Sequence, residues 1–220
     1  MSKEKPSLYS YFRSSASYRA RIALHLKKID FKYEAVHLLK DGGQQHALNF
    51  LAVNPMGQVP TFVDGMNVIS QSMAIIDYLD SKWPEPRLFP QNEAERASVI
   101  EFCEIINSGI QPLVNLKVGQ TLEKDLGATE AQVKQWRQGF TVRGFQALEK
   151  ILARTAGTYC FGSQITAADV FLEPAVFSAI GLGVRIEEFP LIKKIHDRLS
   201  QVDAFKKAHP SNQPDTPLEN

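Results

Sequence analysis

Residues 8–24 read LYSYFRSSASYRARIAL, a stretch that passes from a short aromatic run into a segment rich in alanine and arginine. The run 8–12 has the aromatic composition typical of a β-strand. Between Ser14 and Lys28 the apolar residues recur three or four positions apart, which predicts an amphipathic helix. We therefore expect a strand that leads directly into a helix, with Ser14 at the junction.

The residues that follow predict the rest of a small mixed sheet. Residues 31–36 alternate apolar and polar side chains, and the runs 59–63 and 67–69 flank Asp64-Gly65, a strong hairpin signal. Residues 72–82 have the spacing of another amphipathic helix. One parallel crossover followed by one hairpin predicts an α/β sheet covered by helices.

The chain changes character near residue 88, after a proline-rich stretch that predicts a stiff linker. The helical patterns beyond it cover residues 93–110, 129–154, 166–179 and 190–201. Thr166 and Asp169 have the spacing of a capping box at a helix start. Gly109, close to the polar Gln111, predicts an irregular helix. The tail from Pro210 is expected to be extended and mobile.

Composition excludes several classes of function. The 220 residues carry 25 Lys and Arg against 24 Asp and Glu, and a net charge of +1 gives no general attraction to nucleic acid or anionic membranes. No apolar run is long enough to span a bilayer, and residues 1–6 do not have the pattern of a signal peptide. Cys103 and Cys160 fit neither a metal site nor a CxxC pair. We expect no metal, no nucleic-acid or membrane partner, and a cytoplasmic location.

Ser14 could have either of two roles. Exposed amides and the positive end of the helix dipole meet where a helix follows a strand, and this environment favours an anion. A hydroxyl at this point could donate to a thiolate and lower the pKa of the thiol. Serine at a helix start is also a common N-cap, so the residues alone leave both interpretations open.

Two further segments are candidates for ligand binding. Val59-Pro60 opens a strand, where the proline is either an ordinary edge-strand residue or a cis residue that turns the Val59 backbone toward a peptide ligand. Gln71 and Ser72 lie between a strand and a helix, where they could bind a carboxylate. The alternative is that Ser70 or Ser72 simply caps the helix.

Taken together, these segments resemble the zeta class of cytosolic glutathione transferases over nearly the whole chain, from Leu8 to about Thr216. The matching runs are LYSYFRSS at 8–15, RARIAL at 19–24, KDGGQQ at 40–45, NPMGQVPT at 54–61, QS at 71–72, AII at 74–76, GIQPL at 109–113 and QPDTP at 213–217. The resemblance implies an α/β thioredoxin-like N-terminal domain at 1–88. It also implies an all-α C-terminal domain at 89–220, with its core at 93–212, and a homodimer.

The resemblance also implies a glutathione site. Ser14 would lie beside the glutathione sulfur with Ser15 assisting, and these two residues would be catalytic. The residues implied to bind glutathione are Ser14, Ser15, Gln45, Val59, Pro60, Gln71, Ser72, Gln111, Asn115 and Lys117, with Pro60 in the cis form. Arg13 and Arg19 would hold a small anionic substrate.

The implied activity is the glutathione-dependent cis–trans isomerisation of maleylacetoacetate to fumarylacetoacetate, a step of tyrosine and phenylalanine catabolism. Thiolate addition would turn the cis double bond into a single bond that rotates, and elimination would leave the trans isomer. The sequence departs from the class at two places. Ala16 stands where the class usually has cysteine, and no arginine occurs near 179–181, where Arg185 is the nearest.

Two other functions remain open. A general zeta-class transferase would conjugate electrophiles or dehalogenate small α-haloacids, and the two departures favour it slightly. A non-catalytic binding module of the same fold is disfavoured by the presence of Ser14, Gln71 and Ser72. A glutaredoxin-like reductase is excluded because position 14 is serine and no CxxC pair exists.

Overall fold

The computed structural model, which describes residues 4–217, contains the strand and the helix predicted on either side of Ser14. The strand β1 is Ser7–Ser10 and the helix α1 is Ser15–Leu26. Residues 1–3, where no signal peptide was expected, lie outside the described residues, as do residues 218–220 at the end of the expected C-terminal domain.

The described chain forms two units. One is built from the residues up to Arg87 together with those from Gln201 onward, and the other is Leu88–Ser200. The first unit contains the whole sheet, and the second is helical. The predicted order of an α/β part followed by helices is therefore present, and the described residues from Gln201 onward pack with the α/β part.

Four strands form one mixed sheet in the order β2-β1-β3-β4. The other strands are β2 (Lys32–Ala35), β3 (Thr61–Asp64) and β4 (Asn67–Ser70). β1 pairs in parallel with β2 and antiparallel with β3, and β3 pairs antiparallel with β4 through a turn at Gly65. The predicted crossover and hairpin are both confirmed.

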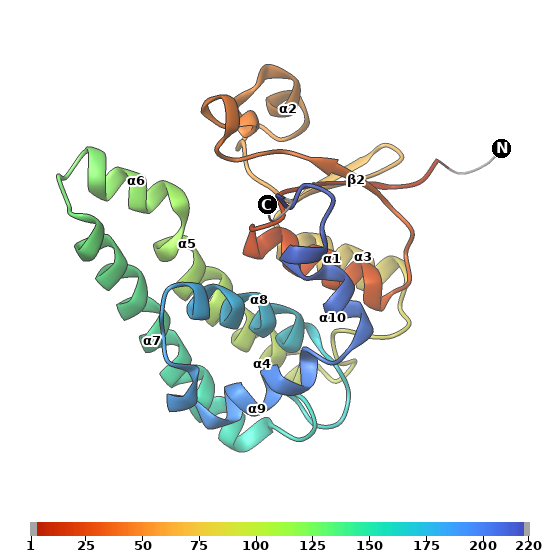
Figure 1. Cartoon of the computed structure of the whole chain (residues 1–220). Helices are drawn as coiled ribbons and strands as arrows, with labels where there is room; N and C mark the ends of the chain where they lie inside the picture. The colour runs from red at the N-terminus through yellow and green to blue at the C-terminus, as the bar shows by residue number, and fades with distance from the viewer. Residues whose placement is uncertain (1–3, 218–220) are drawn as a thin grey trace. The chain divides into compact units, whose positions relative to one another are not determined.

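Helices α1 and α3 (Ser72–Lys82) lie side by side on one face of the sheet, and α10 (Asp203–Ala208) packs against α1 (Figure 1). The short helix α2 (Leu48–Val53) lies on the other side of the sheet, beyond two 3-10 turns at Lys40–Gly42 and Gln44–His46 (Figure 1). The core between the sheet and α1 and α3 is fully buried. It contains Leu8, Ile22, Phe62, Ile75, Ile76 and Leu79. Burial of this apolar surface is the main force that holds the helices on the sheet.

A buried lysine ties the end of α3 and the linker to α1. The Lys27 ammonium is completely buried and donates to Asp80 Oδ1 at 2.8 Å, to the Trp83 carbonyl at 2.7 Å and to the Pro86 carbonyl at 2.8 Å. Three acceptors satisfy all three protons of the ammonium, which is the condition under which a charge can be buried. The linker has no regular element, as predicted, and this network holds its beginning in place.

The second unit consists of helices around a core of aromatic and aliphatic side chains. Its helices are α4 (Glu93–Glu104), α5 (Gln111–Val114), α6 (Leu116–Lys124), α7 (Glu130–Thr155), α8 (Ala167–Gly181) and α9 (Pro190–Leu199), with a 3-10 turn at Ile186–Glu188. The predicted capping box is confirmed, because the Thr166 amide donates to Asp169 Oδ2 at 2.8 Å. Among the described residues, no helix is long and apolar enough to cross a membrane.

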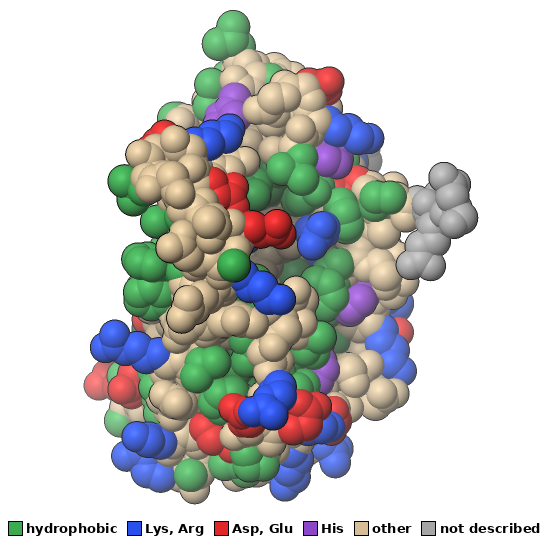
Figure 2. All heavy atoms as spheres, turned by 60° about the vertical axis from the view of Figure 1, so that its left-hand side comes forward, with side chains coloured by type: hydrophobic (Ala, Val, Ile, Leu, Met, Phe, Trp, Pro, Cys, Tyr) green, Lys and Arg blue, Asp and Glu red, His purple; other side chains and the backbone are tan. Residues whose placement is uncertain are grey.

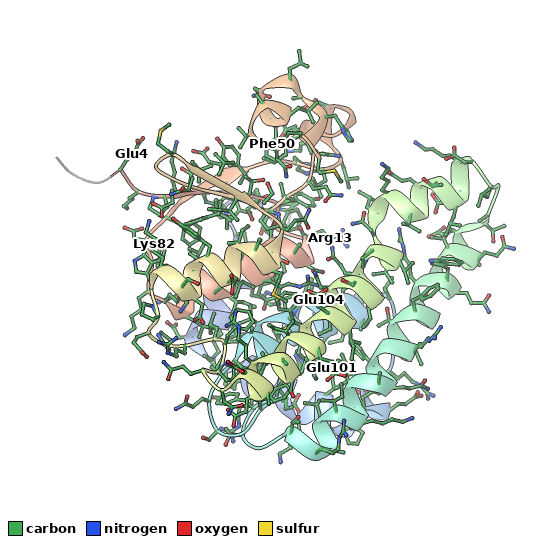
Figure 3. The ribbon with its side chains drawn as sticks, turned by 180° about the vertical axis from the view of Figure 1, so that it is seen from behind. Glu4, Arg13, Phe50, Lys82, Glu101 and Glu104 are labelled. Carbon is green, nitrogen blue, oxygen red and sulfur yellow. The ribbon has the colours of Figure 1, made fainter. Side chains whose placement is uncertain are left out.

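Two expectations need correction. In the segment predicted as one helix at 93–110, the regular α-helix ends at Glu104, a residue labelled in Figure 3. The chain then continues as a π-helix at Ile105–Ile110. This change of winding accounts for the irregularity expected near Gly109. The prediction of an extended, mobile tail from Pro210 is wrong as far as Thr216. Pro210–Asn212 forms a 3-10 turn, and the Gln213 side chain is buried and donates to the carbonyls of Lys207 and His209.

A histidine–carboxylate pair joins α8 to α9. His196 Nδ1 lies 2.8 Å from Glu173 Oε2, and the Glu173 side chain is almost completely buried. The hydrogen bond to Glu173 raises the pKa of His196, although burial opposes this effect. The charged form of His196 therefore stabilises the folded state.

We expect this pair to make the stability of the chain depend on pH. Since the folded-state pKa of His196 lies above its ordinary value of 6.5, the stabilisation is complete below pH 6.5 and is lost as the pH rises through the raised pKa. Urea unfolding of the wild type and of His196→Gln, at a series of pH values across this range, measures the effect. The difference in unfolding free energy between the two proteins should shrink as the pH rises.

The matched control is Gln120→Ala, because Gln120 is exposed on α6 and its side chain carries no titratable group. The difference in unfolding free energy between this variant and the wild type should not change with pH. A constant difference for His196→Gln as well would contradict the assignment of the charged pair.

Candidate functional site

Ser14 lies between a tight turn and the first helix. Its amide donates to the Tyr11 carbonyl at 3.0 Å, and its extended backbone (φ −70°, ψ 117°) makes it the N-cap of α1. The Ser17 amide donates to Ser14 Oγ at 3.2 Å. The N-cap interpretation is therefore confirmed. Capping uses the hydroxyl only as an acceptor, so the hydroxyl proton remains able to donate to an anion.

The residues beside Ser14 make the start of α1 favourable for an anion. Ser15 and Ala16 are half-buried in the first turn, where backbone N–H groups have no acceptor within the helix. Arg13, labelled in Figure 3, is exposed in the turn before α1, and no acidic residue occupies the first turn. The helix dipole and the nearby cation therefore both favour a negative charge at this position.

A buried arginine holds the turn that precedes α1. Arg21 is fully buried, and its Nη1 donates to Ser10 Oγ at 3.1 Å and to the Tyr11 carbonyl at 3.2 Å. Its Nη2 donates to the Phe12 carbonyl at 3.0 Å, and its Nε to the Ala208 carbonyl at 3.0 Å. Burial lowers the pKa of Arg21 to about 10, which leaves the guanidinium charged at neutral pH. Sequence reasoning missed this residue, for which the only signal was an arginine among the apolar positions of the helix.

The peptide bond between Val59 and Pro60 is cis, which decides between the two interpretations of that proline. Asn54 is buried and supports the loop, since its side-chain amide donates to the Gln58 carbonyl at 2.7 Å and to Thr61 Oγ1 at 3.1 Å. Among the described residues, the backbone N–H and C=O of Val59 take part in no ladder or turn hydrogen bond. They are therefore free to pair with an extended peptide.

Gln45 presents an unsatisfied oxygen. Its Oε1 is buried and has no hydrogen-bond partner among the residues described, while its Nε2 lies 3.4 Å from the Leu38 carbonyl. Gly43 has φ 99°, and a Cβ there would lie 2.5 Å from Gln45 Nε2. Gly57 has φ 59°, and its Cβ would lie 3.0 Å from the Gln45 carbonyl. Both glycines have a positive φ that disfavours a side chain, and both leave space beside Gln45, a feature that the sequence did not reveal.

Gln71 and Ser72 lie where β4 meets α3, as expected. Neither Ser70 nor Ser72 is the N-cap of this helix. The N-cap of α3 is Gln71, which makes no side-chain cap and has a φ of 71° that is unfavourable for a residue with a Cβ. Ser72 is buried, and its Oγ accepts from Arg19 Nη1 at 3.2 Å. Arg19 is only 1% exposed, so this structure places it beneath Ser72.

The remaining predicted residues belong to the helical unit. Gln111 is half-buried at the first position of α5, directly after the π-helix. Asn115 is the N-cap of α6, where its Oδ1 accepts from the Lys117 amide at 3.0 Å, and the Lys117 side chain is exposed. Within this unit the three residues lie on consecutive short elements.

Because the surface charge is mixed, recognition of an anion would depend on individual groups such as Arg13 and the open amides at the start of α1. Figure 2 shows Lys and Arg side chains mixed with Asp and Glu on one face, in keeping with the net charge of +1. Within residues 4–217, no group of three His, Cys, Asp or Glu side chains could hold a metal ion. Both cysteines are buried, and burial raises the pKa of the Cys160 thiol, so neither is a reactive thiolate. Polar groups therefore remain open to a ligand at Ser14, Gln45 and Val59.

The family models that match are described as "Glutathione S-transferase, N-terminal domain", over residues 5–81, and "Glutathione S-transferase, C-terminal domain", over residues 114–208. The chain is 46% identical to the maleylacetoacetate isomerase of Mus musculus, a match that covers 100% of this chain and 99% of that protein.

Two solved structures are also similar over their whole length. One is a bacterial maleylpyruvate isomerase described as a glutathione S-transferase of the zeta class, with a TM-score of 0.93, 37% identity, and coverage of 96% of this chain and 100% of that chain. The other is the maleylacetoacetate isomerase of Anaeromyxobacter dehalogenans with glutathione bound in its active site. Its TM-score is 0.88 at 35% identity, and the match covers 97% of this chain and 98% of that chain.

Proposed function

The chain belongs to the zeta class of the glutathione S-transferase family, and from this membership we propose that it isomerises maleylacetoacetate to fumarylacetoacetate with glutathione as its cofactor. The main observation behind the proposal is the position and hydrogen bonding of Ser14. It is held at the start of α1, among open helix amides, with a hydroxyl proton that capping does not use. A thiolate is the anion that this arrangement would stabilise.

The reaction requires a thiolate, an oriented substrate and stabilisation of negative charge. Glutathione, when bound, supplies the thiolate that adds to the conjugated double bond and leaves after rotation. Ser14, with Ser15 assisting, would lower the pKa of the thiol by donating to the charged form. Arg13 is the exposed cation next to Ser14 and would bind a substrate carboxylate. Arg19, predicted for the same task, is better placed to support Ser72 because it is buried beneath it.

We assign the parts of glutathione to the open groups of the site. Gln45 would use its unsatisfied Oε1, and Val59, turned by the cis bond to Pro60, would pair through its backbone with the cysteinyl and glycyl parts. Gln71 and Ser72, at the amide-rich start of α3, would bind the γ-glutamyl end. The helical unit would contribute Gln111, Asn115 and Lys117.

We also propose that the chain consists of an N-terminal domain at 1–88 and a C-terminal domain at 89–220. The irregular linker that begins at Trp83 supports this boundary. The residues from Gln201 onward would then belong to the second domain in chain order while packing with the first.

We further infer a cytoplasmic location. Both cysteines are free and buried, which is the state that a reducing compartment maintains. Recovery of the protein with the membrane or periplasmic fraction of cells would contradict the inference.

The purified protein is expected to isomerise maleylacetoacetate only when glutathione is present, because none of its own thiols is reactive. The rate should be measured spectroscopically with glutathione, without it, and with S-methylglutathione, a matched control that fills the site but lacks the thiol. Maleylpyruvate should be tested alongside, since a relative that isomerises it is 37% identical to this chain.

Other results would identify the alternatives. An equal rate without glutathione would contradict the mechanism. Dechlorination of α-haloacids without isomerisation would favour a general transferase of the class, which the alanine at position 16 makes conceivable. Failure to bind glutathione in calorimetry would leave the non-catalytic binding module.

The Ser14→Ala variant should lose roughly a hundredfold in kcat, the magnitude typical of removing one donor to a catalytic anion. Its affinity for glutathione should change much less, since Gln45, Val59 and Gln71 remain. The thiolate of bound glutathione can be read by ultraviolet absorbance. Ser98→Ala is the control, because Ser98 lies within α4 and its hydroxyl donates to the Ala94 carbonyl of the same helix. An undiminished thiolate population in Ser14→Ala would refute the role of Ser14.

We propose a homodimer that uses the edge of the sheet. β4 is an edge strand, and Met66 and Val68 beside its turn are 98% and 52% exposed. An exposed apolar edge strand is a surface on which another chain can pair. The wild type is expected to sediment as a dimer, and Met66→Lys should shift it toward the monomer. A monomeric wild type at micromolar concentration would disprove the proposal.

A further inference from the structure

The carboxylate of Asp215 lies against the turn that carries Ser14, 203 residues away from Phe12 in the sequence. The Phe12 amide donates to Asp215 Oδ2 at 3.0 Å, and the Tyr33 hydroxyl donates to Asp215 Oδ1 at 2.6 Å. All of these residues belong to the same compact unit. The carboxylate thus joins the end of the chain to both the turn and β2.

The turn is held from both sides of Phe12. Asp215 accepts from its N–H, and Arg21 donates to its C=O at 3.0 Å. The Tyr11 carbonyl accepts from Arg21 and from the Ser14 amide, so the position of Ser14 follows from the position of this turn. Hydrogen bonds to charged groups are shorter and stronger than neutral ones, which makes both contacts stiff.

The segment that presents Asp215 is itself held in place. The Gln213 side chain donates to the carbonyls of Lys207 and His209 at 2.9 and 2.8 Å, and the Thr216 amide donates to the Gln213 carbonyl at 3.1 Å. Gln213 is buried, whereas Asp215 is half-buried. The carboxylate is therefore presented to the turn in one orientation.

Tyr33 remains a donor over the working pH range. Burial, and then the hydrogen bond to Asp215, raise the pKa of Tyr33 well above its ordinary value of 10.0. The two donors to the Asp215 carboxylate, the Phe12 amide and the Tyr33 hydroxyl, thus both keep their protons near neutral pH. The negative charge of Asp215 also acts on Arg21, whose pKa it raises against the larger effect of burial.

We propose that Asp215 is a positioning residue for Ser14, and that through the Phe12 amide it keeps the Ser14 hydroxyl aimed at the glutathione sulfur. The proposal rests on the role given to Ser14 under the proposed function. Asp215 touches neither cofactor nor substrate and acts only through the turn. A displacement of about 1 Å in such a group can lower a rate roughly a hundredfold.

The test uses the full chain with Asp215→Ala, Asp215→Asn and Tyr33→Phe. Asp215→Ala should lower kcat about 10- to 100-fold, change the KM for glutathione much less, and raise the apparent pKa of the bound thiol in the pH profile. Asp215→Asn should recover part of the loss, because its amide oxygen can still accept from Phe12. Tyr33→Phe should lose less than Asp215→Ala, and should cause no further loss when combined with it.

The control is Asp203→Asn, which removes an exposed carboxylate of α10 that pairs with Lys207 at 2.8 Å. It should leave kcat and the pH profile unchanged. If Asp215→Ala does not fold, the same measurements on Asp215→Asn and Tyr33→Phe decide the question. A wild-type pH profile in the folded variants would overturn the proposal, whether or not their melting temperature falls, since a purely structural contact would not alter the thiol pKa.

A failure of the proposed function would be distinguishable. In that case the wild type itself would show no glutathione-dependent activity, and the positioning would be read from amide hydrogen exchange. Asp215→Ala should then speed exchange at Phe12 and Ser14 relative to the wild type and Asp203→Asn. Unchanged exchange at both amides would overturn the proposal independently of any activity.

Discussion

The buried guanidinium of Arg21 is the interaction on which the N-terminal unit depends. It lies in α1 and donates to groups at the end of β1, in the turn before the helix, and at the end of α10. A buried charge is costly unless its donors are satisfied, and four acceptors satisfy this one. Because these acceptors are mostly backbone carbonyls, the charge determines where the chain runs and not merely which side chains meet.

The candidate site is built on such supports. Several of the residues proposed to bind glutathione have a buried residue or a glycine behind them. Arg19 lies beneath Ser72, Asn54 holds the loop before Pro60, and Gly43 leaves room for Gln45. Asp215 completes the set by holding the turn before α1 from outside the helix. A site of this kind can bind a flexible peptide because its own groups are already oriented.

Much of this could be predicted from local sequence. The strand, the helix and the hairpin follow from hydrophobic spacing and from Asp64-Gly65, and Ser14 at the first helix start follows from the same pattern. The positive φ of Gln71 could not be predicted, because nothing in its neighbours demands it. The tail was misread because prolines suggest an extended chain, whereas the partners of Asp215 are Phe12 and Tyr33, far away in the sequence.

The sequence by itself determined the order of elements, the family, and the absence of a cysteine where Ala16 stands, and it predicts a domain boundary near residue 88. These features depend on residues that are neighbours in the sequence or on short sequence motifs, both of which can be read without knowing the fold. Only the tertiary structure decided that Arg19 lies beneath Ser72 and that Asp215 lies against Phe12 and Tyr33. It also confirmed the cis form of Pro60 that the family resemblance implied. Buried polar groups choose their partners by distance in space, because burial leaves them no water to bind.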